Sequence, residues 1–154
     1  MISILFVCAG NICRSPAMAA VLEKMLSEKK ASTRFTIDSC ATTAYYLGSN
    51  TDERMRKAAE KRGVQIHHRA KLFDERFFQL FDHIIAADKD ILKTLEKMAT
   101  TPQQKAKLHL AGSFSTKYLN EDIPDPYYGG EKGFDHVMDM IEDVCHGILK
   151  YLGE

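Results

Sequence analysis

The N-terminal residues combine a short apolar run with a helix-start signal. Ile2 to Val7 is rich in β-branched and aromatic residues and almost free of polar ones, as in a strand buried on both faces of a parallel sheet. Ser15 is a favoured N-cap and Pro16 a favoured first helical residue. The pattern therefore predicts a strand that ends at Cys8 and a helix that begins at Ser15.

Apolar strands and amphipathic helices alternate along the rest of the chain. Further strands are predicted at residues 34–38, 83–87 and 107–111, and helices at 52–63, 74–80, 88–98 and from about 131 onward. This alternation implies right-handed βαβ units, so we expect an α/β fold with a four-stranded parallel sheet and helices on both of its faces. Ligands of such sheets bind beyond the carboxyl ends of the strands, where Cys8 is expected.

The turn after the first strand has the chemistry of an oxyanion site. Five residues separate Cys8 from Arg14, and a tight loop of this length directs its backbone N–H groups and the positive helix end toward one anion. Gly10 would let the backbone come close, and Arg14 adds a planar fork for two phosphate oxygens. Such surroundings lower a thiol pKa from about 8.5 to roughly 3.5–7.5, so Cys8 is predicted to be a nucleophile. A structural cysteine and a helix-capping arginine would not explain this combination.

Asp125 is the best candidate for a proton donor. Cleavage of a phosphate ester needs a proton for the leaving oxygen when the leaving group is poor, as in the case of a phenol, whose pKa is about 10. Asp125 lies between Pro124 and Pro126, whose fixed φ angles stiffen the loop that presents it. Pro-Asp-Pro is also ordinary turn chemistry, so these residues alone leave both interpretations open.

Composition limits the possible function classes. The 154 residues, 45% of them hydrophobic, suit one globular domain over residues 1–154. Basic and acidic residues number 21 each, so no overall charge predicts binding to nucleic acid or membrane. Four dispersed cysteines and the absence of a signal or membrane segment favour the cytoplasm. No His/Cys cluster has zinc-ligand spacing, so we expect no metal.

The segment Val-Cys-Ala-Gly-Asn-Ile-Cys-Arg-Ser-Pro at 7–16 closely resembles the signature of the low-molecular-weight protein tyrosine phosphatases. The resemblance continues through segments 64–70, 81–88 and 125–129 and so covers essentially the whole chain. It implies hydrolysis of phosphotyrosine in proteins, with release of inorganic phosphate and no cofactor. Cys8 would form a phosphocysteine, Arg14 would hold the phosphate, and Asp125 would act as general acid and then as base.

The resemblance also implies supporting roles by position. The phosphate-binding residues would be Ala9, Gly10, Asn11, Ile12, Cys13 and Ser15. Asn11 and Ser15 look like part of the family's hydrogen-bond network around the loop, together with Ser39 and His68. Tyr45, Tyr127 and Tyr128 look like the aromatic walls of the substrate cleft. Without the resemblance, His68 would be interpreted as a satisfied buried histidine.

Cys13 carries a separate hypothesis. In a loop curled around one anion it should lie close to Cys8, so a sulfenic acid on Cys8 could be captured as a disulfide. The alternative is that Cys13 only fills space beneath the loop. We also expect a monomer or a weak homodimer.

Three alternative functions share part of these features. An arsenate reductase on the same fold needs further cysteines around the third strand, and residues 80–98 contain none. Phosphoarginine phosphatases of the family carry Thr where this chain has Ile12. A non-catalytic phosphate-binding module would be expected to lack Cys8 or Asp125. A protein tyrosine phosphatase is therefore the predicted function.

Overall fold

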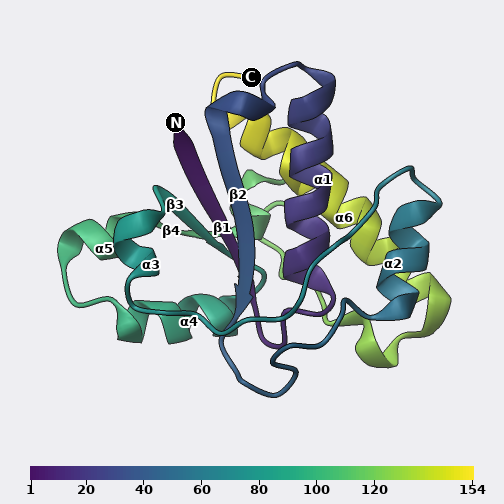
Figure 1. Cartoon of the computed structure of the whole chain (residues 1–154), viewed down its shortest axis with the longest axis horizontal. Coiled ribbons are helices and arrows are strands. Elements are labelled where there is room, and N and C mark those ends of the chain that lie inside the picture. Colours follow the sequence, from purple (N-terminus) through teal and green to yellow (C-terminus); the bar gives the residue numbers. More distant parts are fainter.

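The computed structural model describes all residues 1–154 and has one parallel sheet at its centre (Figure 1). The strands are β1 (Ile2–Cys8), β2 (Phe35–Ala41), β3 (His83–Ala86) and β4 (Leu108–Leu110). Their order is β2-β1-β3-β4, so β1 lies between β2 and β3 and every neighbouring pair is parallel. The predicted α/β fold with a four-stranded parallel sheet is confirmed.

Helices cover both faces of this sheet (Figure 1). One side holds α1 (Arg14–Glu28), α2 (Glu53–Glu60) and α6 (Gly130–Tyr151). The other holds α3 (Phe77–Leu80), α4 (Lys89–Met98) and α5 (Pro102–Ala106). Short 3₁₀ turns occur at Ser32–Arg34, Ala111–Phe114 and Pro126–Tyr128. None of the helices has the length and apolarity that a membrane crossing requires.

The two core layers follow from the alternation of side chains along β1. Ile4 and Phe6 pack into the cluster formed with α1 and α6, while Leu5 and Val7 pack into the smaller cluster formed with α4. All four side chains are fully buried, which explains why the strand is apolar on both faces from Ile4 to Val7.

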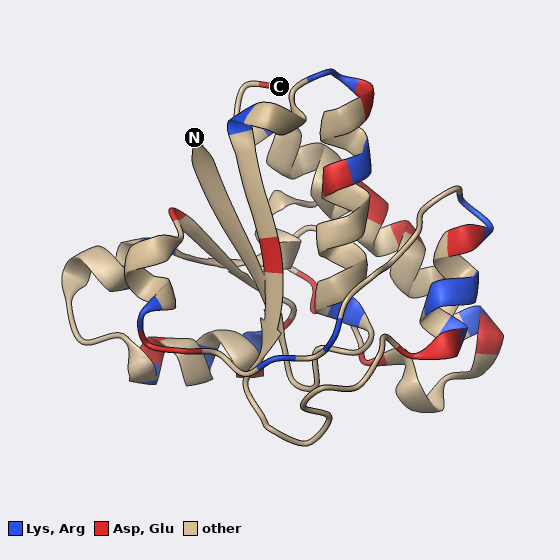
Figure 2. Ribbon diagram, viewed as in Figure 1, with Lys and Arg blue, Asp and Glu red and all other residues tan.

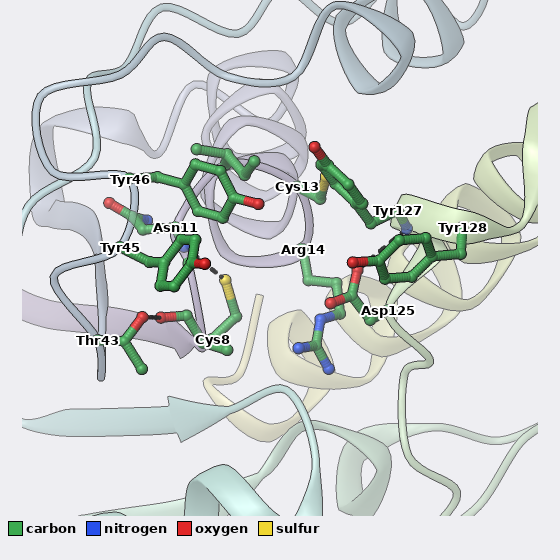
Figure 3. Close-up of a pocket in the computed structure, with 13 residues that line it drawn as sticks. Cys8, Asn11, Cys13, Arg14, Thr43, Tyr45, Tyr46, Asp125, Tyr127 and Tyr128 are labelled. Atoms are coloured by element: carbon green, nitrogen blue, oxygen red, sulfur yellow. Dashed lines mark hydrogen bonds between the residues drawn. The ribbon is translucent and has the colours of Figure 1, made fainter.

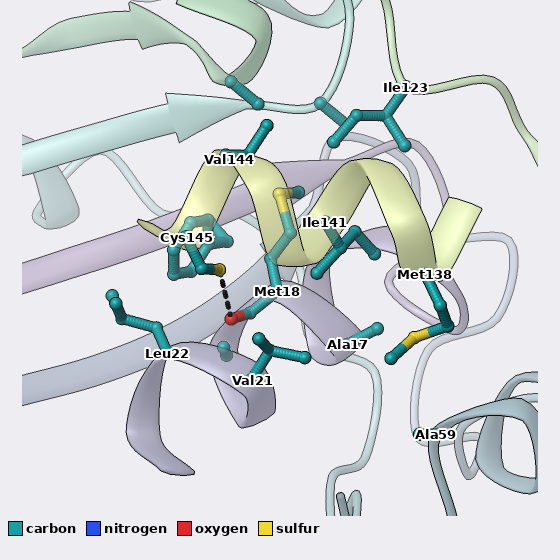
Figure 4. Packing of buried hydrophobic residues seen from close by; sticks show 14 of the residues in the cluster. Ala17, Met18, Val21, Leu22, Ala59, Ile123, Met138, Ile141, Val144 and Cys145 are labelled. Carbon is teal, nitrogen blue, oxygen red and sulfur yellow. Dashed lines mark hydrogen bonds between the residues drawn. The ribbon is translucent and has the colours of Figure 1, made fainter. Parts of the chain in front are cut away.

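α1 and α6 pack closely against each other in the larger of the two core clusters (Figure 4). The Cys145 thiol donates to the carbonyl of Met18 at 3.6 Å across the two helices. At Gly147 a Cβ atom would lie 1.7 Å from the carbonyl oxygen of Phe114, so only glycine allows α6 to approach the turn after β4. Lys and Arg residues alternate with Asp and Glu over the helices, in keeping with the balanced composition (Figure 2).

The structure differs from the sequence pattern at several element ends. α1 begins at Arg14 rather than Ser15, and no side chain caps its N-terminus. Ser15 is not an N-cap because its hydroxyl is used by Cys8. β2 runs on to Ala41 because it pairs with β1 along its whole length. α5 is an additional helix, which Thr101 caps before Pro102.

Candidate active site

Cys8 is the last residue of β1, and its sulfur lies at the centre of the loop that leads into α1. The backbone N–H groups of Asn11 and Ser15 donate to Sγ at 3.2 and 3.5 Å. The Ser15 hydroxyl lies 2.9 Å from the same sulfur. The Cys8 sulfur is therefore the point on which these polar groups of the loop converge.

Arg14 is buried, and an acidic residue that follows the neighbouring strand β3 orients it. Its Nη1 donates to the Asp88 carboxylate at 2.6 Å and to the carbonyl of Ile123 at 2.9 Å. Burial lowers the pKa of Arg14, but the negative charges of Cys8 and Asp88 outweigh it and raise that pKa above its ordinary value. Nε and Nη2 remain without protein partners, which leaves a fork for two oxygens of an anion.

Asn11 holds the loop in shape. It has a φ of 58°, a left-handed conformation that costs of order 1–2 kcal/mol for a residue other than glycine. Its Nδ2 donates to the hydroxyls of Ser15 at 2.7 Å and Ser39 at 3.0 Å. Its Oδ1 accepts from His68 Nε2 at 2.7 Å and from the N–H of Lys71 at 3.1 Å. These four bonds compensate for the strained backbone.

His68 and Ser39 complete this network beneath the loop. His68 Nε2 also lies 3.2 Å from the Ser39 hydroxyl. Burial lowers the pKa of His68, so the ring is neutral at pH 7 and carries its proton on the nitrogen that faces Asn11. The structure thus brings together all four residues that the resemblance assigns to the network.

Asp125 lies in the loop before the turn Pro126–Tyr128, with its carboxylate at the mouth of the same cavity. It accepts the N–H of Tyr127 at 3.0 Å and so caps that turn. The turn that Asp125 caps thus places this residue at the cavity that contains Cys8, and its role as a proton donor stays a prediction.

The cavity has a volume of about 280 Å³ and is open to solvent. Figure 3 shows Tyr45 and Tyr46 on one side, Asp125, Tyr127 and Tyr128 on the other, and Cys8 and Arg14 between them. The remaining lining residues are Ala9, Gly10, Asn11, Ile12, Cys13 and Thr43.

Cys13 lines the cavity as a free thiol, and all four cysteines are unpaired. Burial, together with the nearby Asp52 carboxylate and Cys8, raises the pKa of the Cys13 thiol well above its ordinary value. Cys13 is therefore a neutral thiol at pH 7 in the cavity that holds Cys8.

Three residues of the site, Asp88, Thr43 and Tyr46, were not predicted as site residues. Asp88 follows β3 at the carboxyl edge of the sheet, and this position was the available signal. Tyr46 packs on Gly10, where a Cβ atom would lie 2.8 Å from Tyr46 Cδ2, so the small residue makes room for an aromatic ring. Its interaction with the neighbouring Tyr127 raises the pKa of Tyr46 to about 12. Its position beside Tyr45 was its only sequence signal.

Comparison with known proteins gives consistent results. The family model described as Low molecular weight phosphotyrosine protein phosphatase matches residues 3–154. A protein of that name from Gallus gallus is 36% identical over 149 residues, which cover 96% of this chain and 94% of the relative. A protein tyrosine phosphatase structure from Entamoeba histolytica superposes with a TM-score of 0.96 at 38% identity, covering 99% and 97% of the two chains. The structure of a Drosophila arginine phosphatase has a TM-score of 0.91 at 29% identity, with 98% of each chain covered.

Proposed function

The chain belongs to the low-molecular-weight phosphotyrosine protein phosphatase family, and from this premise we propose that it hydrolyses phosphotyrosine in proteins through a phosphocysteine on Cys8. The observation that carries the proposal is that Cys8, Arg14 and Asp125 line one cavity with aromatic walls. A nucleophile, a cationic fork and a carboxyl group are the three groups that such a reaction needs. We propose no cofactor or metal for it.

In the first half-reaction, the Cys8 thiolate attacks phosphorus in line with the leaving oxygen. An S–P bond forms while the P–O bond to the tyrosine ring breaks, and Asp125 gives its proton to the departing phenolate oxygen. The free N–H groups of Arg14 and the loop amides hold the other phosphate oxygens. Because these donors are already in place, little reorganisation is needed as charge moves to the leaving group.

In the second half-reaction, Asp125 is a carboxylate and acts as the base. It takes a proton from a water molecule, whose oxygen attacks phosphorus while the S–P bond breaks. Cys8 leaves as a thiolate, which the hydroxyl of Ser15 and the amides around Sγ stabilise. Inorganic phosphate is released, and Asp125 is protonated again for the next cycle.

The cavity walls support an aryl phosphate as the substrate. A phosphate beside Arg14 must enter between Tyr45 on one side and Tyr127 and Tyr128 on the other, and a flat phenyl ring spans this distance. Phosphoserine is too short to bring phosphorus to the sulfur without burial of its backbone. Ring contacts of this kind are worth about 0.5–1.5 kcal/mol each, so reach and leaving-group chemistry account for most of the selectivity.

Phosphoarginine is the second candidate substrate, because one structural neighbour is named as an arginine phosphatase. Ile12 favours phosphotyrosine over it. Its side chain presents only hydrocarbon to the cavity, so guanidinium N–H groups of a phosphoarginine would lose water without gaining partners.

We further propose that residues 1–154 act as one catalytic domain, as a monomer or weak homodimer, on phosphoproteins of the cytoplasm. The four unpaired cysteines support a reducing compartment, where a catalytic thiol stays active.

A panel of phosphotyrosine, phosphoserine and phosphoarginine peptides, assayed with a chelator present, tests the proposal. We expect phosphate to be released fastest from the phosphotyrosine peptide, and at the same rate with and without the chelator. Cys8→Ser should show no turnover. Cys8→Ser should still bind phosphate or vanadate, because Arg14 and the loop amides remain. Substantial turnover by Cys8→Ser, or preference for another phosphoamino acid, would overturn the proposal.

A further inference from the structure

A second pocket lies between residues 50–51, the first turn of α2 and residues 66–69. Its volume is about 450 Å³, and it is broadly open to solvent. The lining residues are Asn50, Thr51, Arg56, Ile66, His67, His68 and Arg69. None of them is acidic, although Asp and Glu are as numerous in the chain as Lys and Arg.

The two arginines of this pocket are the only arginines of the chain without an ion pair. Five others contact a carboxylate within 4 Å, namely Arg14, Arg34, Arg54, Arg62 and Arg76. Arg56 and Arg69 bond only to backbone carbonyls, through Nε to Thr51 at 3.2 Å and through Nη1 to Gly48 at 3.2 Å. These bonds orient both guanidinium groups and leave their charge uncompensated.

Other polar groups also line this pocket. The Thr51 side chain is buried, and its Oγ1 has no hydrogen-bond partner. His67 and His68 add two imidazoles, and His68 Nδ1 has no protein partner. Two guanidinium forks, imidazoles and small polar groups are the donor set that recognises phosphate, because a fork matches two phosphate oxygens at once.

We propose that this pocket is a second anion site, specific for a phosphate dianion either free or as the monoester of a small molecule, and that its occupancy is coupled to the catalytic loop through His68. The binding of an anion in this pocket is independent of the function proposed above. The coupling to the loop between β1 and α1 rests on that function.

Two connections carry the coupling. His68 Nε2 donates to Asn11 Oδ1 at 2.7 Å, and Asn11 in turn donates its N–H to the Cys8 sulfur. An anion beside His68 favours the imidazolium, which keeps its Nε2 proton and strengthens the bond to Asn11.

The second connection runs through the backbone. Arg69 forms a β-bridge with Asn50, and Ala70 bonds to Gly48 and Ser49 on the same loop. The same loop carries Tyr45 and Tyr46, which line the cavity that contains Cys8. An anion bound between Asn50 and Arg69 therefore stabilises that side of the cavity. Coupling between two sites is reciprocal, so a catalytic-site ligand must also change affinity at the second site.

Amide NMR of the full chain, titrated with inorganic phosphate against sodium chloride at equal ionic strength, tests the binding. We expect two groups of shifted amides, residues 8–15 and residues 48–51 with 66–69, with different midpoints. Arg56→Gln/Arg69→Gln should lose only the second group. Arg34→Gln/Arg76→Gln removes the same charge from exposed ion pairs elsewhere and should keep both groups. A second group that is absent, that chloride reproduces or that survives in Arg56→Gln/Arg69→Gln would overturn the site.

The same titration with phenylphosphonate, which cannot be hydrolysed, distinguishes the two sources of the anion. Shifts of the second group with both probes indicate a site that accepts monoesters, and shifts with inorganic phosphate alone indicate a site for the free ion.

Steady-state kinetics with 4-nitrophenyl phosphate test the coupling. Inorganic phosphate should change both KM and kcat of the parent and of Arg34→Gln/Arg76→Gln. It should be a purely competitive inhibitor of Arg56→Gln/Arg69→Gln. Purely competitive inhibition of the parent would overturn the coupling. Absence of any turnover would instead contradict the proposed function, and the NMR result would still decide the binding.

Discussion

The Asp88 carboxylate holds the Arg14 guanidinium at 2.6 Å in a largely buried ion pair. Asp88 follows β3 and Arg14 begins α1, so the pair joins the carboxyl ends of two adjacent strands. This contact occupies Nη1 and fixes the orientation of the guanidinium group, which leaves Nε and Nη2 for an anion in the cavity.

Asp88→Asn should therefore weaken catalysis without loss of the fold. Asparagine keeps the side-chain oxygen that caps α4 through the N–H of Ile91 but removes the charge that positions Arg14. A charge-assisted hydrogen bond is worth about 1.5–3 kcal/mol, so kcat/KM should fall about 10- to 100-fold. Asp90→Asn, on an exposed neighbour in the same helical turn, is the matched control. An unchanged kcat/KM would remove Asp88 from the positioning of Arg14.

Asp125→Ala should slow turnover by an amount that depends on the leaving group. A phenol with a high pKa needs the proton, whereas an activated phenol leaves as its anion, so the loss should grow with leaving-group pKa. Rates for a series of aryl phosphates measure this slope. Asp122→Ala, an exposed carboxylate of the same loop that bonds to Lys89, should leave the slope unchanged. An equal loss for every aryl phosphate would exclude Asp125 as the acid.

Cys13 should protect the enzyme against peroxide. Peroxide oxidises the Cys8 thiolate to a sulfenic acid, and the Cys13 sulfur then attacks Cys8 sulfur to form a disulfide with release of water. Its raised pKa means that Cys13 loses its proton only as this bond forms. Peptide mapping should find a Cys8–Cys13 disulfide that thiols reverse.

Recovery of activity after peroxide checks the protective role. Cys13→Ser should recover poorly, because further oxidation of Cys8 is irreversible. Cys145→Ser, a fully buried thiol between α1 and α6, should recover like the parent. If Cys13→Ser recovers as completely as the parent, Cys13 only fills space beneath the loop.

The sequence predicts the fold well because its signals are local. The apolar run of β1 and the Ser15-Pro16 dipeptide mark the loop between them, and every residue from Ala9 to Cys13 belongs to that one loop. The exact helix start was not predictable, because Ser15 bonds to Cys8 and not to the helix backbone.

Contacts between distant segments were less accessible to the sequence. Asp88 reaches Arg14 only because β3 lies beside β1, and no local pattern gives strand order. Tyr46 fills the space over Gly10, and Arg56 and Arg69 line one pocket because Asn50 pairs with Arg69. Such contacts depend on the packing of the whole chain.

Ile12→Thr should shift the substrate preference toward phosphoarginine. Ile12 is nearly buried in the cavity wall, and a threonine hydroxyl there can accept an N–H of a guanidinium. A site that satisfies a buried polar group gains about 1–3 kcal/mol over one that leaves it unpaired, so the activity ratio of phosphoarginine to phosphotyrosine should rise about 5-fold or more. Ile12→Val, which shortens the side chain without adding a hydroxyl, separates the effect of the hydroxyl from the effect of cavity size.

The ratio of the kcat/KM values for matched phosphoarginine and phosphotyrosine peptides measures the substrate preference of each variant. A parent that already prefers phosphoarginine, or a Thr variant with the ratio of the Val variant, would contradict the role of Ile12 while leaving the phosphatase assignment intact.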